Sequence, residues 1–144
     1  MDLNLNWKIE GEEQLARRLR ILGGNVKDFK SEFKKSTSFL KRFFSGEVFT
    51  SKGKAIGEPW KARKGRATNP LLQKTGRMRA GFKTKAERLE GEVFNAIDYF
   101  KYHQSGRPRR NLPRRIMMKL TEQLKDKIVG FFHEGVWKKV NKRV

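Results

Sequence analysis

A stripe of apolar residues at helical spacing constrains the fold of this chain more than any other feature of its sequence. Its members recur at intervals of three, four or seven residues: Val26, Phe29, Phe33, Leu40 and Phe44. This spacing predicts a helix of about five turns with one apolar face, and Asn25 is the expected N-cap. An aromatic stripe can also stack against a ligand or a nucleic-acid base, but helical periodicity favours its use as core.

Other parts of the sequence carry the pattern of β-strands. Near the start, Leu3, Leu5, Trp7 and Ile9 alternate with polar residues, and this period of two predicts a strand with one buried face. Residues 81–86 and 91–97 predict two strands of a hairpin around residues 87–91. Residues 114–118 are expected to add a short strand.

Further helices are expected before and after these strands. Residues 12–22 predict a short first helix that ends at Gly23 and Gly24, and residues 71–78 a turn or short helical piece. A final helix is expected from Thr121 and Glu122, loosened near Gly135. Its apolar face consists of Leu120, Leu124, Ile128, Phe131 and Phe132. The expected fold is α+β: one domain over residues 1–144, with a small antiparallel sheet packed on one face by the long helix and the final helix.

Two segments lack a regular pattern. Residues 45–70 are rich in glycine, proline and basic side chains, and loops longer than about 15 residues in a compact domain are usually functional or disordered. We therefore expect a long, flexible basic loop that projects from the body, with Trp60 alone fixed to the core. Residues 136–144 form a basic tail for which helical, frayed and partner-ordered states are all open.

The composition argues against metal and cofactor chemistry. The chain has no cysteine, and its two histidines, His103 and His133, are 30 positions apart, which is no metal-ligand spacing. Because His103 has no spaced carboxylate partner, we expect it to form hydrogen bonds at a turn and not to act in catalysis. We expect no enzymatic activity, no metal and no cofactor. The start of the chain lacks a signal peptide pattern and no run of about 18 apolar residues occurs, so synthesis in the cytosol is expected.

The largest anomaly in the composition is charge. The chain has 35 Lys and Arg against 15 Asp and Glu, a net charge of +20. Such a field attracts nucleic acid, acidic proteins or anionic membranes. The alternative, that the charge serves solubility alone, stays open at this point.

Three short motifs occur in order along the second half of the chain. They are Gly57-x-Pro59-Trp60, then Leu72-x-x-Thr75-Gly76-x-Met78, and then the segment 99–106 followed by 113–118. In order and spacing they resemble the phage virion morphogenesis family, the Mu-like tail completion proteins found at the head-proximal end of a phage tail. The residues that stand at the family's positions are Gly57, Pro59, Trp60, Leu72, Thr75, Gly76, Tyr99, His103, Gln104, Gly106, Pro113 and Arg115.

The third motif departs from the family's pattern at four positions. Ser105 and Met117 stand where aromatic residues are usual, Arg114 where alanine is usual and Ile116 where proline is usual. The resemblance covers residues from about 57 to 118, with a helix expected before and another after. The departures place this chain at the edge of the family.

The resemblance implies a structural role in a virion. It implies a tail completion or head-tail joining (neck) subunit, which forms a homo-oligomeric ring, expected to be a hexamer, at the end of the tail. The implied partners are tail tube or terminator proteins and head-tail connector proteins, with no membrane. The implied location is the virion tail or neck, after assembly in the host cytoplasm, and DNA passing through the ring would contact it without sequence preference.

Two basic clusters are the candidate contact sites for DNA or for an acidic partner. They consist of Lys61, Arg63, Lys64, Arg66, Arg107, Arg109, Arg110 and Arg114. Arginine serves phosphates and carboxylates equally well, so both partners stay open. The main alternative function is a nonspecific nucleic-acid-binding protein of phage or prophage origin, although no recognisable binding module is present. A third alternative, a small nuclease, would need an acidic metal cluster that the sequence does not suggest.

Overall fold

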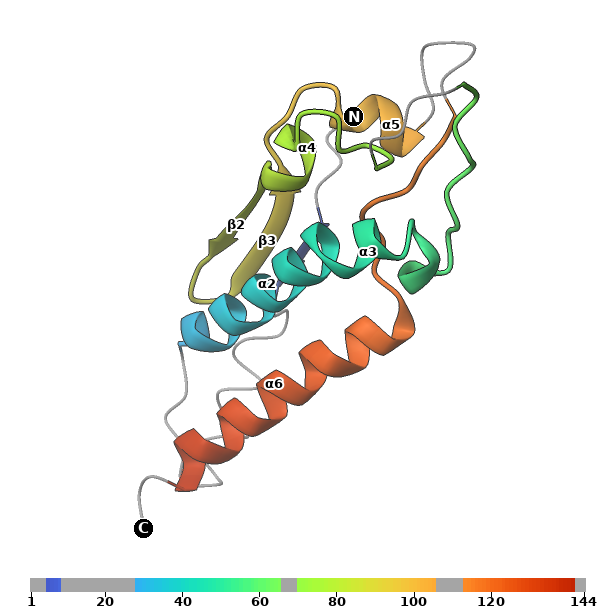
Figure 1. Cartoon of the computed structure of the whole chain (residues 1–144). Coiled ribbons are helices and arrows are strands. Elements are labelled where there is room, and N and C mark those ends of the chain that lie inside the picture. Colours follow the sequence, from blue (N-terminus) through green and yellow to red (C-terminus); the bar gives the residue numbers. More distant parts are fainter. Residues whose placement is uncertain (1–4, 9–27, 66–69, 106–112, 142–144) are drawn as a thin grey trace.

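This computed structural model contains helices and three short strands within its described residues. The structure describes residues 5–8, 28–65, 70–105 and 113–141. In chain order the elements are β1 (Leu5–Lys8), α2 (Lys30–Ser45), α3 (Glu47–Thr50), the 3-10 helix η1 (Lys54–Ile56), α4 (Arg77–Ala80), β2 (Phe82–Ala86), β3 (Glu90–Asn95), α5 (Phe100–Ser105) and α6 (Glu122–Asn141) (Figure 1). The predicted helix over residues 12–22 and its glycines lie outside the described residues.

The sheet is antiparallel, as predicted, and has three strands in the order β1, β3, β2. The predicted hairpin is confirmed: Phe82 lies opposite Asn95 in its register, and the N–H of Glu87 donates to the carbonyl of Glu90 at 2.8 Å in the turn. The first predicted strand pairs with β3 and places Leu5 opposite Val93. Because β3 is central, Val93 is fully buried, while β1 and β2 form the edges.

Helix α2 covers the sheet with the apolar stripe that the sequence predicts. Phe33, Leu40 and Phe44 are at most 1% exposed, and α2 contacts both β2 and β3. The predicted N-cap is wrong, because the helix begins at Lys30 after Phe29. Two hydrogen bonds fix the start of the helix. The carboxylate of Asp28 accepts the N–H of Lys30 at 2.9 Å, and the N–H of Phe29 donates to the carbonyl of Arg88.

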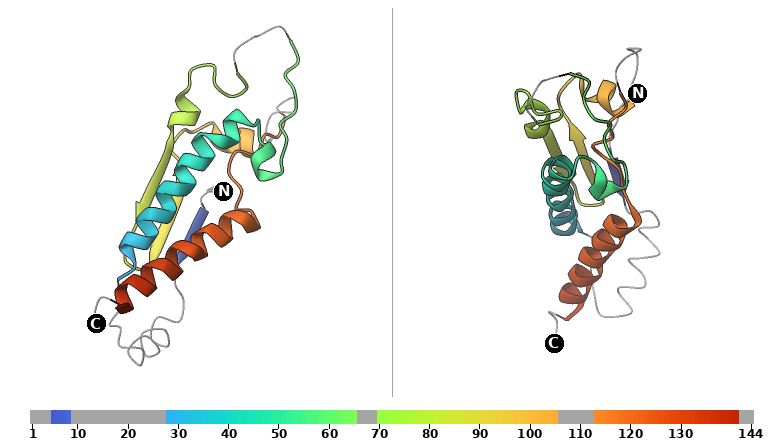
Figure 2. Two further views of the ribbon diagram at one scale, coloured as in Figure 1. Left: turned by 60° about the horizontal axis from the view of Figure 1, so that its bottom comes forward. Right: turned by 45° about the vertical axis from the view of Figure 1, so that its right-hand side comes forward.

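Helix α6 lies alongside α2 (Figure 2). Thr121 caps it, since the hydroxyl accepts the N–H of Leu124 at 3.3 Å. Phe132 packs edge-on against Phe33 with ring centroids 4.8 Å apart. The fold is therefore α+β, with a long helix and a C-terminal helix, as predicted. Within the described residues, no helix has both the length and the apolar character to cross a bilayer.

Gly135 does not loosen α6, contrary to the prediction, because the helix continues to Asn141. A Cβ at this position would collide with the side chain of Glu32 on α2. Glu32 is only 5% exposed and pairs with Lys139 of α6 at 2.7 Å. The glycine therefore lets the two helices approach around a partly buried ion pair.

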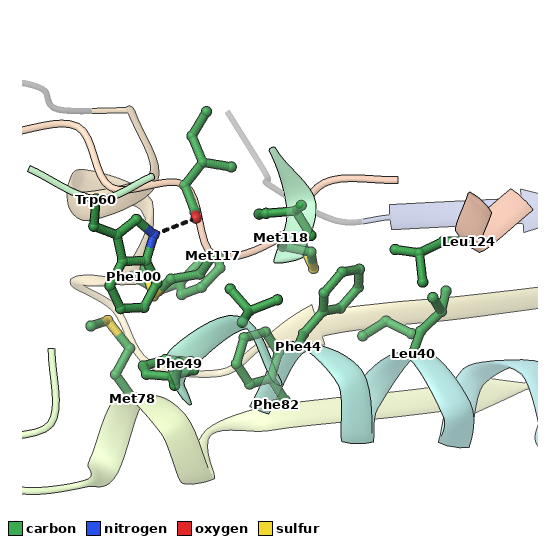
Figure 3. Close-up of a cluster of buried hydrophobic side chains, with 14 of the residues drawn as sticks. Leu40, Phe44, Phe49, Trp60, Met78, Phe82, Phe100, Met117, Met118 and Leu124 are labelled. Atoms are coloured by element: carbon green, nitrogen blue, oxygen red, sulfur yellow. Dashed lines mark hydrogen bonds between the residues drawn. The ribbon is translucent and has the colours of Figure 1, made fainter. Parts of the chain in front are cut away.

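The prediction for residues 45–70 is wrong for their first half. Residues 47–56 form α3 and η1, and their apolar side chains Val48, Phe49 and Ile56 join Trp60 in the core (Figure 3). Gly53 makes this path possible: its φ of 82° lies in the left-handed region, and a Cβ there would strike the ring of Trp60. Only the chain after Trp60 keeps an irregular, largely exposed path, as far as residue 65.

Residues 113–118 form no strand, which also corrects the prediction. Side chains from elsewhere in the fold nevertheless form hydrogen bonds with some of their backbone groups. The side chains of Ile116, Met117 and Met118 are all buried. Figure 3 shows this segment packed over the cluster that α2, α3 and β2 form.

Candidate functional site

The candidate site begins with Trp60, the residue that the first motif singles out. Its indole is 8% exposed and donates from Nε1 to the carbonyl of Ile116 at 2.7 Å (Figure 3). The ring packs edge-on against Phe49 with centroids 5.3 Å apart. Trp60 thus links the end of the first motif to the second part of the third motif, 56 positions away.

The other two residues of the first motif lie in the turn before Trp60. Gly57 has a φ of 71°, in the left-handed region that glycine adopts without strain, and it ends the 3-10 helix η1. Pro59 is exposed. The turn is closed where the N–H of Trp60 donates to the carbonyl of Lys52 at 2.8 Å. This geometry fixes where the indole enters the core.

Arg115 forms a second link between the same segments. Its guanidinium donates from Nε and Nη2 to the carbonyl of Lys61 at 3.1 and 3.0 Å, and its backbone N–H donates to the carbonyl of His103 at 2.8 Å. The side chain is only 8% exposed. Burial, and then the charge of Arg63, lower the pKa of Arg115 from its ordinary value.

Gln104 replaces the strand partner that residues 113–118 lack. Its side-chain oxygen accepts the N–H groups of Met117 and Met118 at 2.8 and 3.3 Å, and its nitrogen donates to the carbonyl of Met118 at 2.7 Å. One amide side chain therefore satisfies three backbone groups of a buried, irregular segment. This is the physical reason for a glutamine at this position of α5.

The second motif forms the turn that leads into α4. Gly76 has a φ of 72°, and the hydroxyl of Thr75 accepts the N–H of Arg77 at 3.4 Å. Leu72 packs partly buried against the core, and it too adopts a positive φ of 62°. The following hairpin is tied to this turn by Asn95, whose side-chain nitrogen donates to the carbonyl of Met78 at 2.8 Å.

Residues of the second and third motifs, together with Arg63, line a recess of about 250 Å³ beside α4 and α5. Its lining consists of Arg63, Leu72, Lys74, Thr75, Met78, Tyr99, His103 and Arg115. No acidic residue is among them. Sequence reasoning selected most of these residues separately but missed Lys74, which lies within the second motif next to Thr75. We refer to this site as the basic recess.

His103 is half-buried in the wall of the basic recess. Burial, followed by the charge of Arg115, lowers the pKa of His103 below its ordinary value of 6.5. Its Nδ1 is buried and has no hydrogen-bond partner among the described residues. Tyr99, one turn earlier, lies edge-on to the imidazole at 6.3 Å between ring centroids. No carboxylate is among the residues that line the basic recess together with His103.

The predicted contact residues fall into three groups. Lys61, Lys64 and Arg114 are exposed, while Arg63 is half-buried in the recess. Arg114 and Lys119 lie near Glu58, and the Lys119 hydrogen bond at 2.7 Å is the main cause that lowers the pKa of Glu58. The remaining predicted residues lie outside the described part of the chain: Arg66, Gly106, Arg107, Arg109 and Arg110.

A second, more open hollow of about 540 Å³ lies on α6. It is lined by Gln123, Asp126, Lys127, Gly130, Phe131 and Glu134. Across residues 5–8, 28–65, 70–105 and 113–141, no group of three or more histidine and acidic side chains is placed to hold a metal ion. Comparison with protein-family models, with curated proteins and with solved structures finds no significant match.

Proposed function

We propose that this chain is a structural subunit of a phage virion, a tail completion or head-tail joining protein. The observation that supports the proposal is the bonding between the first and third motifs. Trp60 donates to the carbonyl of Ile116, Arg115 donates to the carbonyl of Lys61 just after the first motif, and Gln104 bonds the two parts of the third motif to each other. Each motif alone is weak evidence for the family. Motifs whose residues form hydrogen bonds with one another are stronger evidence, because they belong to one part of the fold.

In this role the protein acts by assembly and not by chemistry. Subunits form a ring, expected to be a hexamer, at the head-proximal end of the tail, where they meet the tail tube or terminator and the connector of the head. Assembly takes place in the host cytoplasm and the ring remains in the virion. A ring of subunits with a charge of +20 suits a channel that DNA crosses, or acidic surfaces of neighbouring proteins.

A specific observation favours the second candidate, a nonspecific nucleic-acid-binding protein. Neither residues 59–86 nor residues 99–121 contain Asp or Glu, and these stretches carry the exposed side chains of Lys61, Lys64 and Lys74. A basic surface attracts phosphate backbones without reading sequence.

The salt dependence of DNA binding separates the two functions. The measurement is the fluorescence anisotropy of a labelled 20-base-pair duplex, titrated with protein at rising salt. An assembly subunit is expected to release the duplex well before about 150 mM salt, because it lacks an ordered set of phosphate contacts. Submicromolar affinity that persists at physiological salt would favour the nucleic-acid-binding protein and count against the tail protein.

A further inference from the structure

Helix α6 exposes an aromatic side chain that the fold does not bury. Trp137 is 69% exposed, the largest exposed fraction among the large apolar side chains of the described residues. A tryptophan that finds a partner buries about 150–250 Å², and tryptophan is enriched among the residues that dominate binding energy at protein interfaces. The exposed ring is therefore suited to anchor another molecule.

The open hollow of about 540 Å³ lies on the same face of α6 as this ring. One of its lining residues is Gly130, where an added Cβ would meet nothing within 4 Å. Trp137 follows Gly130 by seven residues, which is close to two helical turns and about 10.5 Å along the axis. A projecting ring and a hollow are thus next to each other on one helix face.

We propose that this face of α6 binds a second copy of this chain, with the two helices antiparallel. A two-fold axis passes midway between Gly130 and Trp137, beside His133, so that Trp137 of each copy lies over Gly130 of the other. The axis makes the two insertions equivalent, and one complementary pair of features is used twice. The missing side chain at Gly130 lets the helix axes approach to about 8 Å.

The charge of this face favours a second copy over DNA or an acidic partner. The chain has a net charge of +20, so two copies repel each other in general. The charged residues that line the hollow are Asp126, Lys127 and Glu134, and Glu134 pairs with Lys138 at 2.9 Å and Lys35 at 3.7 Å. Acidic and basic groups nearly balance here, which lets a second positively charged copy approach.

The order of charges along α6 favours the antiparallel arrangement. Residues 122–134 contain three acidic residues and two lysines, whereas residues 135–141 contain two lysines and no acidic residue. An antiparallel pair places the first part of one helix beside the second part of the other and opposes the two helix dipoles. A parallel pair in register would bring the two basic ends together and leave Trp137 two turns away from the hollow.

This contact goes beyond the proposed ring and does not depend on it. A two-fold contact is complete with two copies, whereas a ring needs head-to-tail contacts through other faces. The α6 pair therefore joins either free subunits or subunits of two different rings.

Cysteine cross-linking tests the contact locally, because the chain has no cysteine of its own. His133 is exposed, and His133→Cys places a thiol beside the proposed axis, where the two copies meet. Lys34→Cys places the matched control thiol on the exposed face of α2. A disulfide needs Cα atoms within roughly 4.4–6.8 Å of each other. The measurement is the initial rate at which disulfide-linked dimer forms under mild oxidation, read on a denaturing gel.

The His133→Cys protein is expected to form this dimer at least about tenfold faster than the Lys34→Cys protein, because pairing raises the local concentration of its thiols. Two further changes should each slow cross-linking of the His133→Cys protein by about tenfold or more. Trp137→Ser removes the ring, and Gly130→Gln fills the hollow; both positions are exposed, and circular dichroism checks that the helices persist. Equal rates for the two thiols, or a rate that either change leaves unaltered, would overturn the proposal.

The contact and the proposed function can fail separately. A particle of ring mass in which His133→Cys cross-links no faster than Lys34→Cys would keep the virion role and reject the contact. A dimer that Trp137→Ser converts to monomers, and that grows no larger at low salt or at 0.5 M salt, would keep the contact and reject the ring.

Discussion

Trp60 shows how one side chain can hold two distant segments together. The substitution Trp60→Phe keeps an aromatic ring in the core but removes the indole N–H. The buried carbonyl of Ile116 then has no donor from this side chain. We expect a loss of about 1–3 kcal/mol in the free energy of unfolding, measured by urea denaturation. Trp137→Phe is the matched control, because Trp137 is 69% exposed, and it should change stability by less than about 0.5 kcal/mol. Equal effects would contradict the assigned role.

The lowered pKa of His103 implies that the stability of the protein depends on pH. Its pKa in the folded protein lies below the ordinary value of 6.5 because of burial and Arg115, so the unfolded chain takes up the proton first as the pH falls. Stability is therefore expected to decrease as the pH drops below about 6.5, until the folded pKa is passed. Urea denaturation of wild type and His103→Asn at about pH 7.5 and 5.5 checks this. The variant should lose less stability on acidification than wild type does, and an equal loss would contradict this prediction.

At the scale of elements, the contact between α2 and α6 depends on a glycine. Gly135→Ala should destabilise the protein although alanine favours helices, because the new methyl group collides with Glu32 and disturbs its pair with Lys139. Gly130→Ala, on the same helix, has nothing within 4 Å of the added Cβ and should stabilise by about 0.5–1 kcal/mol. Thermal unfolding of the two variants should therefore shift in opposite directions. A shift in the same direction would mean that α6 does not pack as described.

The regular elements were predictable because their patterns are local. The stripe of α2, the alternation of β1 and the hairpin of β2 and β3 follow from spacings within a few residues. Trp60 and Gln104 were predicted as motif residues, but their hydrogen-bond partners were not predicted. Gln104 satisfies residues 117 and 118 through its side chain, and no local pattern announces such a partner, so a strand was wrongly expected.

The same reason explains the errors at residues 47–56 and at Gly135. Val48, Phe49 and Ile56 are too few and too irregularly spaced to show a helical stripe, yet each meets the core through tertiary contacts. Gly135 has the sequence pattern of a helix breaker. In the fold it leaves room for the side chain of Glu32, which is more than a hundred positions away in the sequence. The basic recess was likewise visible only as separate residues, because three segments must fold before it exists.

At the scale of the whole molecule, the charges are distributed unevenly over the chain. Acidic side chains of α2 and α6 pair with lysines, as Glu32 does with Lys139 and Glu134 with Lys138. The segments around the basic recess contain no acidic residue to balance their cations. In a head-to-tail ring, such asymmetry would let one face of a subunit meet a different face of its neighbour. Assembly through these faces is the central claim of the proposed function.

The most direct test of that claim is the mass of the purified protein in solution, measured by light scattering at low salt and at 0.5 M salt, with and without a short DNA duplex. The proposed function predicts a particle several times heavier than the 16.9 kDa chain, with the same mass at both salt concentrations and without bound duplex at 0.5 M. A monomer that moves onto the duplex and stays there at physiological salt would contradict it.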